Sequence, residues 1–201
     1  MLFRSSLGTD LSVELPENHL WLGGSEKTTG GRPFNANMPT EEIFTAPRLD
    51  GVNGVVCSAK PLVVNGDIAD KFRFTLKDGK IVAVEAERGK KLLETAISVD
   101  EGACRLGEVA LVPYDSPISN TGILFYNTLF DENASCHFAF GEAYPCIQGG
   151  SDMTKEELKA LGFNDSFTHH DFMVGTPDLS ITGVTHDGRQ IPVFVNGNFA
   201  F

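Results

Sequence analysis

The sequence has no long apolar run and no recognisable leader. None of its apolar stretches approaches the roughly 18 residues that a membrane-spanning helix needs, so we expect no membrane segment. The first eight residues lack an apolar core followed by a small-residue cleavage site, which would mark a secretory signal. The absence of both features predicts a cytoplasmic protein.

Positive charge is also scarce. Lysine and arginine together number 16 against 27 acidic residues, which gives a formal net charge of -11. A chain this acidic repels phosphate backbones and anionic lipid headgroups, so we expect neither nucleic acid nor a membrane surface as a partner. The simplest interpretation of the acidic excess is solubility, but carboxylates that ligate metal ions would contribute to it as well.

Cysteine is sparse and unpaired in the sequence. The four cysteines are Cys57, Cys104, Cys136 and Cys146, and no two of them form a CxxC pair. The spacing therefore gives no structural zinc motif. Because a chain of 201 residues can build a core without disulfides, we expect these thiols to be reduced packing residues.

Two hairpins stand out in the pattern of the chain. Asp78-Gly79 separates two alternating runs, 72–76 and 80–85, and Asp-Gly is a strong hairpin signal because both residues tolerate positive φ. Asp187-Gly188 repeats the device before a strand-like run at 190–195. Further strands are predicted at 11–15, 54–58 and 108–113.

Helices are few. Thr154 and Glu157 form a capping-box pattern at the start of a helix that ends at Leu161-Gly162, and 89–97 is a second candidate. The mixture predicts an α+β fold with a mostly antiparallel or mixed β-sheet and a few short helices. We expect a single domain over residues 1–201, because no internal linker interrupts the chain.

The polar groups that suggest chemistry begin with two acids in an apolar stretch, 37–47. If this stretch is extended, the side chains of Glu41 and Glu42 point to opposite faces, so only one of them can easily serve as a ligand in a given cavity. The other would be a base, a supporting group or a surface charge.

Glu108 interrupts a second apolar segment, 106–113. A carboxylate buried there would be costly unless it is paired or coordinates a metal ion. The competing interpretation is a glutamate on an edge strand that faces solvent, and this segment alone does not decide between the two.

Two more segments carry histidines. Glu132 and His137 lie five residues apart among aromatic residues, with Tyr144 following closely. A lone histidine in such a place is more often a satisfied core residue than a ligand. On a strand, His169 and Asp171 would share one face while His170 points away, which makes a reasonable but common ligand pair.

Taken together, these groups favour a metal site. Buried carboxylates usually need a cation, and lysine and arginine are scarce beside these acids. Four carboxylates and two neutral imidazoles would balance two divalent cations. Mixed carboxylate and imidazole ligands suit zinc, cobalt or manganese better than calcium or magnesium.

The same segments resemble the signature blocks of one family, the M29 (thermophilic aminopeptidase T-like) metalloaminopeptidases. The resemblance runs in order from about residue 7 to the end of the chain. The blocks are Gly8–Leu11, Asn37–Pro47, Gly107–Pro113, Ser116–Ser119, Leu129–Ala134 with His137, and the His-x-Asp-Phe-Met-Val-Gly run at 169–175.

The resemblance implies six ligands around two divalent metal ions, with Glu108 as the bridging carboxylate. The ligands are Glu42, Glu108, Glu132, His137, His169 and Asp171. It also implies that Tyr144 lines the site and stabilises the transition state. The choice of Glu42 over Glu41 rests on register, and Glu41 is then the candidate general base.

The implied activity is removal of residues from the free N-terminus of peptides, by a water activated between the metal ions. Family resemblance suggests a homodimer. Family members also carry an additional N-terminal domain, so the chain corresponds to the C-terminal, metal-bearing catalytic part alone. Two alternatives remain: a metal-binding or dimerisation domain that is inactive without its N-terminal domain, and a different two-metal amide hydrolase.

Overall fold

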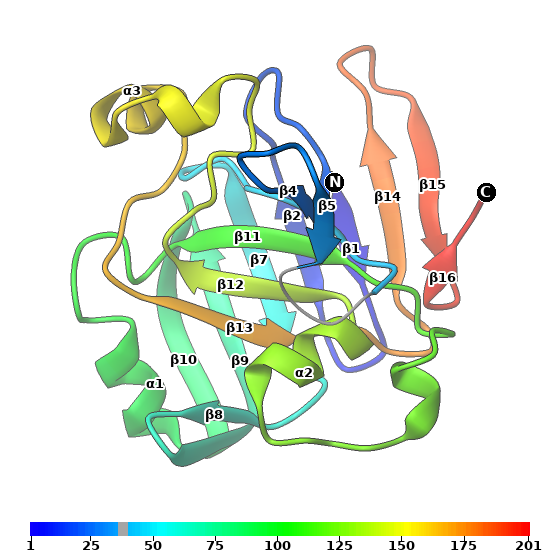
Figure 1. The fold of residues 1–201 in the computed structure, drawn as a ribbon. Helices are drawn as coiled ribbons and strands as arrows, with labels where there is room; N and C mark the ends of the chain where they lie inside the picture. The colour runs from blue at the N-terminus through cyan, green and yellow to red at the C-terminus, as the bar shows by residue number, and fades with distance from the viewer. Residues whose placement is uncertain (36–39) are drawn as a thin grey trace.

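The computed structural model describes residues 1–35 and 40–201, which form two antiparallel sheets and a separate hairpin (Figure 1). The larger sheet has nine strands. In spatial order they are β10 (Lys80–Arg88), β9 (Asp67–Lys77), β7 (Val52–Cys57), β2 (Asp10–Val13), β1 (Leu2–Arg4), β14 (Ser180–Val184), β15 (Gln190–Val195) and β16 (Asn198–Phe199), with β8 (Leu62–Val64) paired to β9.

The smaller sheet has five strands, which cross the larger sheet at a steep angle (Figure 1). Their order is β13 (His169–Met173), β12 (His137–Gly141), β11 (Leu106–Leu111), β6 (Ile43–Thr45) and β3 (Leu22–Gly23). The separate hairpin consists of β4 (Ser25–Lys27) and β5 (Pro33–Asn35). The predicted fold of mostly antiparallel sheet with short helices is confirmed.

Phenylalanine rings fill the space between the two sheets. Phe3 of the larger sheet meets Phe138 of the smaller one with ring centroids 5.0 Å apart. Phe74 lies 5.7 Å from Phe140 and 5.4 Å from Phe172 in the same way. Because alternate side chains on a strand point to opposite faces, committing these rings to the core leaves the other face of β12 and β13 for different residues.

The connections follow the turn and capping signals of the sequence. Asp78 and Gly79 both have positive φ, 48° and 76°, in the turn that joins β9 to β10. Both halves of the capping box form between Thr154 and Glu157. The helices are α1 (Lys90–Ala96), α2 (Thr128–Asp131) and α3 (Lys155–Ala160), with 3-10 turns η1 (Ser119–Thr121), η2 (Glu132–Ala134) and η3 (Gly150–Asp152).

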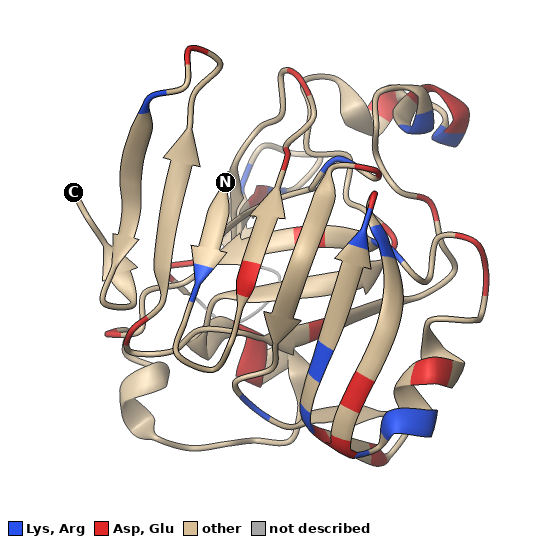
Figure 2. Cartoon of the chain, turned by 180° about the vertical axis from the view of Figure 1, so that it is seen from behind, with Lys and Arg blue, Asp and Glu red and all other residues tan. Residues whose placement is uncertain are grey.

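The outer face of the larger sheet is charged with both signs, as the view from behind shows (Figure 2). Arg73 on β9 pairs with Glu85 on β10 at 2.7 Å, and Lys71 pairs with Glu87 at 2.9 Å. These pairs are exposed, so each adds little to stability, but they mark this face as the solvent face. No helix in the described chain is long and apolar enough to cross a membrane.

Candidate metal centre

The strand register places two of the predicted ligands in one row across the smaller sheet. Glu108 on β11 is opposite Ala139 on β12, and Ala139 is opposite Asp171 on β13. Phe138 and Phe140 point into the core, so Ala139 and the carboxylates on either side of it share the outer face. The small methyl group of Ala139 leaves open the space between the two carboxylates.

His137 stands on the same face, one row further along. It is opposite Ala110 on β11, and Ala110 is in turn opposite Phe44 on β6. Glu42 comes just before β6 and reaches His137, with Oε1 at 3.1 Å from Nε2 of the imidazole. The sheet therefore brings together an acid near residue 42 and a histidine near residue 137.

Glu132 enters from the segment that precedes β12. Asn127 caps α2 by accepting a hydrogen bond from the Leu129 amide, and the buried Asp131 carboxylate accepts bonds from the Phe125 and Asn127 amides. These bonds fix the turn that leads into η2, which begins at Glu132. Glu132 is thereby held over the sheet face that carries the other ligands.

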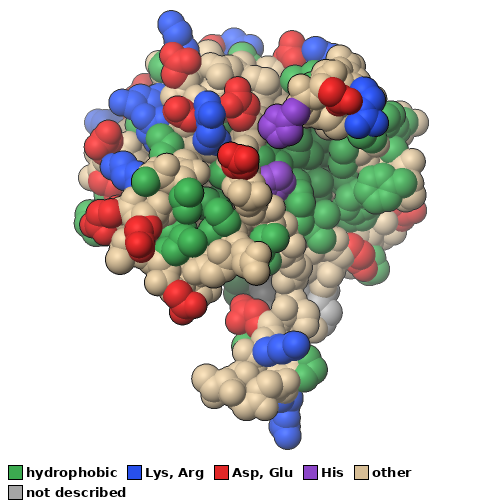
Figure 3. Space-filling model, turned by 90° about the horizontal axis from the view of Figure 1, so that it is seen from above, with side chains coloured by type: hydrophobic (Ala, Val, Ile, Leu, Met, Phe, Trp, Pro, Cys, Tyr) green, Lys and Arg blue, Asp and Glu red, His purple; other side chains and the backbone are tan. Residues whose placement is uncertain are grey.

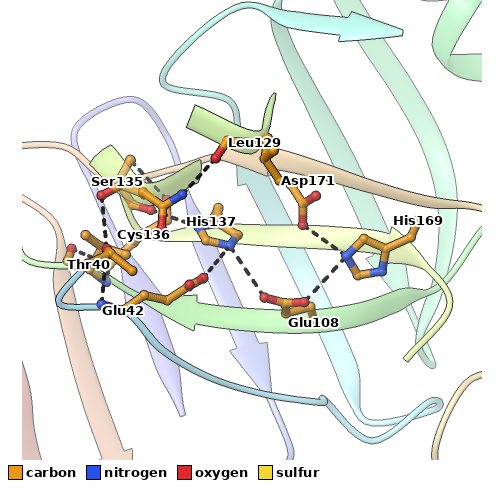
Figure 4. A network of polar contacts seen from close by, with 11 residues as sticks. Thr40, Glu42, Glu108, Leu129, Ser135, Cys136, His137, His169 and Asp171 are labelled. Atoms are coloured by element: carbon orange, nitrogen blue, oxygen red, sulfur yellow. Dashed lines mark hydrogen bonds and ion pairs between the residues drawn. The ribbon is translucent and has the colours of Figure 1, made fainter. Parts of the chain in front are cut away.

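All six predicted ligands lie together (Figure 4). They form three overlapping triplets, and within each triplet one ligand atom per residue lies within 4.8 Å of the others. The triplets are Glu42, Glu108 and His137; Glu108, His169 and Asp171; and Glu132, His137 and Asp171. Glu108 joins two of the triplets, and its two oxygens face different histidines: Oε1 lies 3.5 Å from His137 and Oε2 lies 3.4 Å from His169.

Both histidines are oriented by backbone carbonyl groups. Nδ1 of His137 donates to the Ser135 carbonyl at 2.9 Å, and Nδ1 of His169 donates to the Glu142 carbonyl at 2.8 Å. This arrangement leaves Nε2 of each ring directed at the carboxylates. Histidines that bind metal ions through one nitrogen are typically held through the other in this manner.

Protonation responds strongly to this crowding. Burial alone would lower the pKa of His169, but its hydrogen bonds with Asp171 and Glu108 raise the pKa to about 11. The same opposition raises the pKa of His137 well above its usual value. Burial, followed by the charge of Asp171, raises the pKa of Glu132 to about 8. Without a metal ion, protons therefore bind where a cation would neutralise the cluster.

The cluster lies at the base of a cavity of about 730 Å³. Tyr144 borders this cavity with its ring 5.2 Å from that of His169 and 5.8 Å from that of Phe44. Burial and the nearby carboxylates raise the pKa of Tyr144 to about 12, so its hydroxyl remains protonated and able to donate a hydrogen bond. The face seen in Figure 3 shows histidine side chains among apolar ones at the surface.

Comparison with known proteins identifies the family. The family model described as thermophilic metalloprotease (M29) matches residues 1–199. The chain belongs to the M29 family. It is 54% identical over 195 residues to aminopeptidase AmpS of Bacillus subtilis and 52% identical over 195 residues to aminopeptidase 2 of Geobacillus stearothermophilus. These alignments cover 96% of the chain but 48% and 47% of the relatives, so the chain spans about half their length.

A solved M29 structure has the same fold. Wild-type AmpT from Thermus thermophilus matches with a TM-score of 0.92 and 44% identity, covering 100% of this chain and 49% of that one. The fold also recurs in 2,5-dihydroxypyridine dioxygenase from Pseudomonas putida, with a TM-score of 0.59 and 14% identity over 99% of this chain and 54% of that one. At such low identity, this second match concerns the fold alone.

The cluster of this M29 chain fits metal ions by its own chemistry. Glu108 is 5% exposed and His137 is 1% exposed, and the ion pairs that Glu42, Glu108 and Asp171 form in the described chain are all with histidine. Buried carboxylates without lysine or arginine partners are costly unless a cation balances them. The interpretation of Glu108 as an edge-strand glutamate is wrong, because β11 lies inside the sheet between β12 and β6.

The two ambiguous pairs of neighbouring residues separate clearly. Glu42 lies in the cluster, whereas Glu41 is exposed and borders an adjacent hollow lined also by Thr40 and Asn35. His169 lies in the cluster, whereas His170 turns toward the core, with its ring 5.0 Å from that of Phe140. Residues 37–39 of the same block lie outside the described residues.

Sequence reasoning missed two parts of this M29 site. The Ser135 and Glu142 carbonyl groups that orient the histidines carry no side-chain signal, because any residue supplies a carbonyl. The segment from Leu22 to Lys27 borders the cavity without any acid-histidine pattern. Its one distinctive feature is the Gly23-Gly24 pair, which indicates close approach of the backbone to something else.

Proposed function

We propose that this chain is the catalytic, metal-bearing part of an aminopeptidase that removes residues from the free N-terminus of peptides. The observation that carries the proposal is the six-residue cluster beneath an open cavity in a chain about half identical to named aminopeptidases. Its sequence matches only half the length of those relatives, so the activity is proposed for the chain and not transferred from them.

In this proposal two divalent cations bind to Glu42, Glu108, Glu132, His137, His169 and Asp171, with Glu108 shared between them. Carboxylate and imidazole ligands together favour zinc or cobalt, with manganese as a further candidate. When bound, such a pair of ions supplies an activated water and polarises the scissile carbonyl. The Ser135 and Glu142 carbonyls hold the two imidazoles in the orientation this requires.

The residues of the chain then account for substrate choice. The acidic cavity attracts the ammonium group of a free N-terminus, and an acetylated terminus loses that charge. The Tyr144 hydroxyl donates a hydrogen bond to the carbonyl oxygen as negative charge develops there. The exposed Glu41 stays our candidate for a general base that carries a proton to the leaving amine, from its position in the adjacent hollow.

A second candidate rests on the length of the chain. If the half of the relatives that this chain lacks completes the cavity, the chain binds metal and forms a homodimer but does not turn over peptide. A third, another two-metal amide hydrolase, would use the same cluster on a substrate without a free amine. All three predict metal binding, so substrate dependence must separate them.

The deciding experiment compares a short peptide with its N-acetylated copy. The purified chain is incubated with zinc or cobalt, and release of the first residue is followed. Cleavage of the free peptide alone is the expected result. Cleavage of both peptides would refute the aminopeptidase proposal in favour of another hydrolase. Cleavage of neither, with two bound metal ions per chain, would favour the non-catalytic alternative.

A further inference from the structure

One wall of the cavity is made of a continuous stretch of main chain. Six consecutive residues, from Leu22 to Lys27, all border the cavity and all are exposed. A strand usually presents only alternate side chains to one side, so an unbroken run indicates that the backbone itself faces the cavity. The stretch runs from β3, the edge strand of the smaller sheet, into β4 of the hairpin that stands out from the body (Figures 1 and 3).

The register of the hairpin shows which backbone groups of β4 are directed outward. The Thr28 amide donates to the Arg32 carbonyl at 2.9 Å. Because opposed residues in an antiparallel ladder alternate between hydrogen-bonded and non-bonded pairs, the next pair, Lys27 and Pro33, is a non-bonded one. The absence of an amide hydrogen on Pro33 agrees with this.

Continuing the alternation along the hairpin, Glu26 and Phe34 form a bonded pair, and Ser25 and Asn35 form a non-bonded pair. The amide and carbonyl groups of Ser25 and Lys27 therefore point away from β5. In the described chain β4 pairs only with β5, so its other edge offers these groups to a further strand.

We propose that the outer edge of β4 binds the main chain of the peptide substrate as an added strand, through the outward amide and carbonyl groups of Ser25 and Lys27. This inference rests on the proposed aminopeptidase function and names how the substrate beyond its first residue is held. Addition of an extended peptide to an exposed strand edge is a recurring mode of peptide recognition.

The surroundings of this edge suit an extended peptide. Gly23 and Gly24 have no side chain, and a Cβ on either would have its nearest neighbour at 3.7 Å, so a peptide backbone can approach closely. Ser25 and Lys27 are two residues apart, about 6.5 Å along a strand, which matches the repeat of a bound extended chain. The acidic cluster borders the same cavity and is the attractive place for the ammonium end.

Recognition through main-chain groups has a consequence for selectivity. Every peptide offers the same amide and carbonyl groups, so this edge holds peptides of any sequence. A ligand with only one residue cannot reach it. The gain in affinity should therefore depend on peptide length and on an intact backbone, and little on side chains beyond the first.

The test removes one outward amide hydrogen. Ser25→Pro deletes the outward donor without removing a bond of the hairpin, since proline is tolerated where the amide faces out from an edge strand. Asn35→Pro is the matched control, because Asn35 is the partner of Ser25 and its outward amide lies on the far edge, on β5. Binding to the metal-loaded chain is measured by calorimetry with two ligands that are not hydrolysed: Leu-Gly-Gly with its first amide reduced, and leucinol.

We expect the wild-type chain to bind the reduced tripeptide more tightly than leucinol. Ser25→Pro should weaken the tripeptide about three- to tenfold, the range for loss of one hydrogen bond, and leucinol less than about twofold. Asn35→Pro should leave both unchanged. Equal tripeptide affinity in Ser25→Pro and wild type, or an equal loss for both ligands, overturns the inference while the proposed function stands.

A measurement on the wild-type chain keeps the inference testable if the proline variant does not fold. The amide hydrogens of Ser25 and Lys27 should exchange with solvent at least about tenfold more slowly with the reduced tripeptide bound than with leucinol bound. Equal exchange with both ligands overturns the inference. If the metal-loaded wild-type chain binds neither ligand, the cluster does not recognise a peptide amine, and the proposed function fails together with the inference.

Discussion

His169 and Asp171 stand on the same face of β13, and Nε2 of the histidine lies 3.1 Å from Oδ1 of the aspartate. Because Nδ1 of the same ring donates to the Glu142 carbonyl, only a proton on Nε2 or a cation makes this contact favourable. The metal-free and metal-loaded forms of the chain must therefore differ in bound protons. That difference leads to a prediction about pH.

The metal-free chain should lose stability as the pH rises. In the folded chain the pKa of His169 is raised to about 11, against about 6.5 when unfolded, so its contribution is complete below about pH 6.5 and is lost toward pH 11. Glu132, with its pKa raised to about 8, acts in the same direction between its usual value and pH 8. Urea unfolding of chelator-treated chain at about pH 6, 7.5 and 9 measures the trend.

Variants and metal ions provide the controls for this trend. His169→Gln should flatten the pH dependence above about pH 6.5, whereas His186→Gln, at an exposed histidine, should keep it. Saturating zinc should remove or reverse the trend, because the cation takes the place of the protons and binds more tightly as they leave. A metal-free chain that is more stable at pH 9 than at pH 6 would contradict the account.

Glu108→Ala should abolish the paired metal site. Glu108 joins two of the three ligand triplets, so its removal takes an oxygen from each. Residues that only orient ligands cost 10- to 100-fold in metal affinity, and a shared ligand should cost more than about 100-fold. Metal content after dialysis measures this. Glu26→Gln, an acid of the same cavity outside the triplets, is the control, and two ions retained by Glu108→Ala would rule out the bridging role.

Gly141→Ala should disturb the site without touching a ligand. Gly141 is opposite His169, has a φ of 110°, and its added Cβ would lie 1.9 Å from the Thr168 carbonyl oxygen. Strain at such a φ and forced displacement of the neighbouring strand each cost about 1–3 kcal/mol. Thermal unfolding should show a loss of about 2–5 kcal/mol, with weaker zinc binding. Gly30→Ala, whose nearest contact would be 3.8 Å, should show neither effect.

Local signals in the sequence were sufficient for the hairpins, the helices and the side of each strand that carries chemistry. Asp78-Gly79 marks its turn because few other pairs accept two positive φ values, and alternation separates His169 from His170. Residue spacing alone could not show that Glu42, Glu108 and His137 converge, because that depends on pairing between strands distant in sequence. Only the family blocks carried that information.

The remaining parts of the site escaped prediction for physical reasons. Glu41 and Glu42 are neighbours just before β6, so the choice between them depends on the direction of a short segment outside regular structure. The β4–β5 hairpin has an exposed surface on every residue and therefore no apolar alternation to reveal it. Features made of backbone groups leave little trace in the identity of side chains.

Tyr144→Phe should separate a catalytic role of the hydroxyl from its packing. Phenylalanine keeps the ring contacts with Phe44 and His169, so folding and metal content should not change. If the hydroxyl donates to the developing negative charge, kcat falls about 10²- to 10³-fold with little change in KM, since the bond strengthens only in the transition state. The pKa of about 12 keeps the hydroxyl protonated, so the pH profile of the wild-type enzyme should show no limb from this group below about pH 10. A rise in KM at unchanged kcat would instead make Tyr144 a residue that binds substrate and transition state equally.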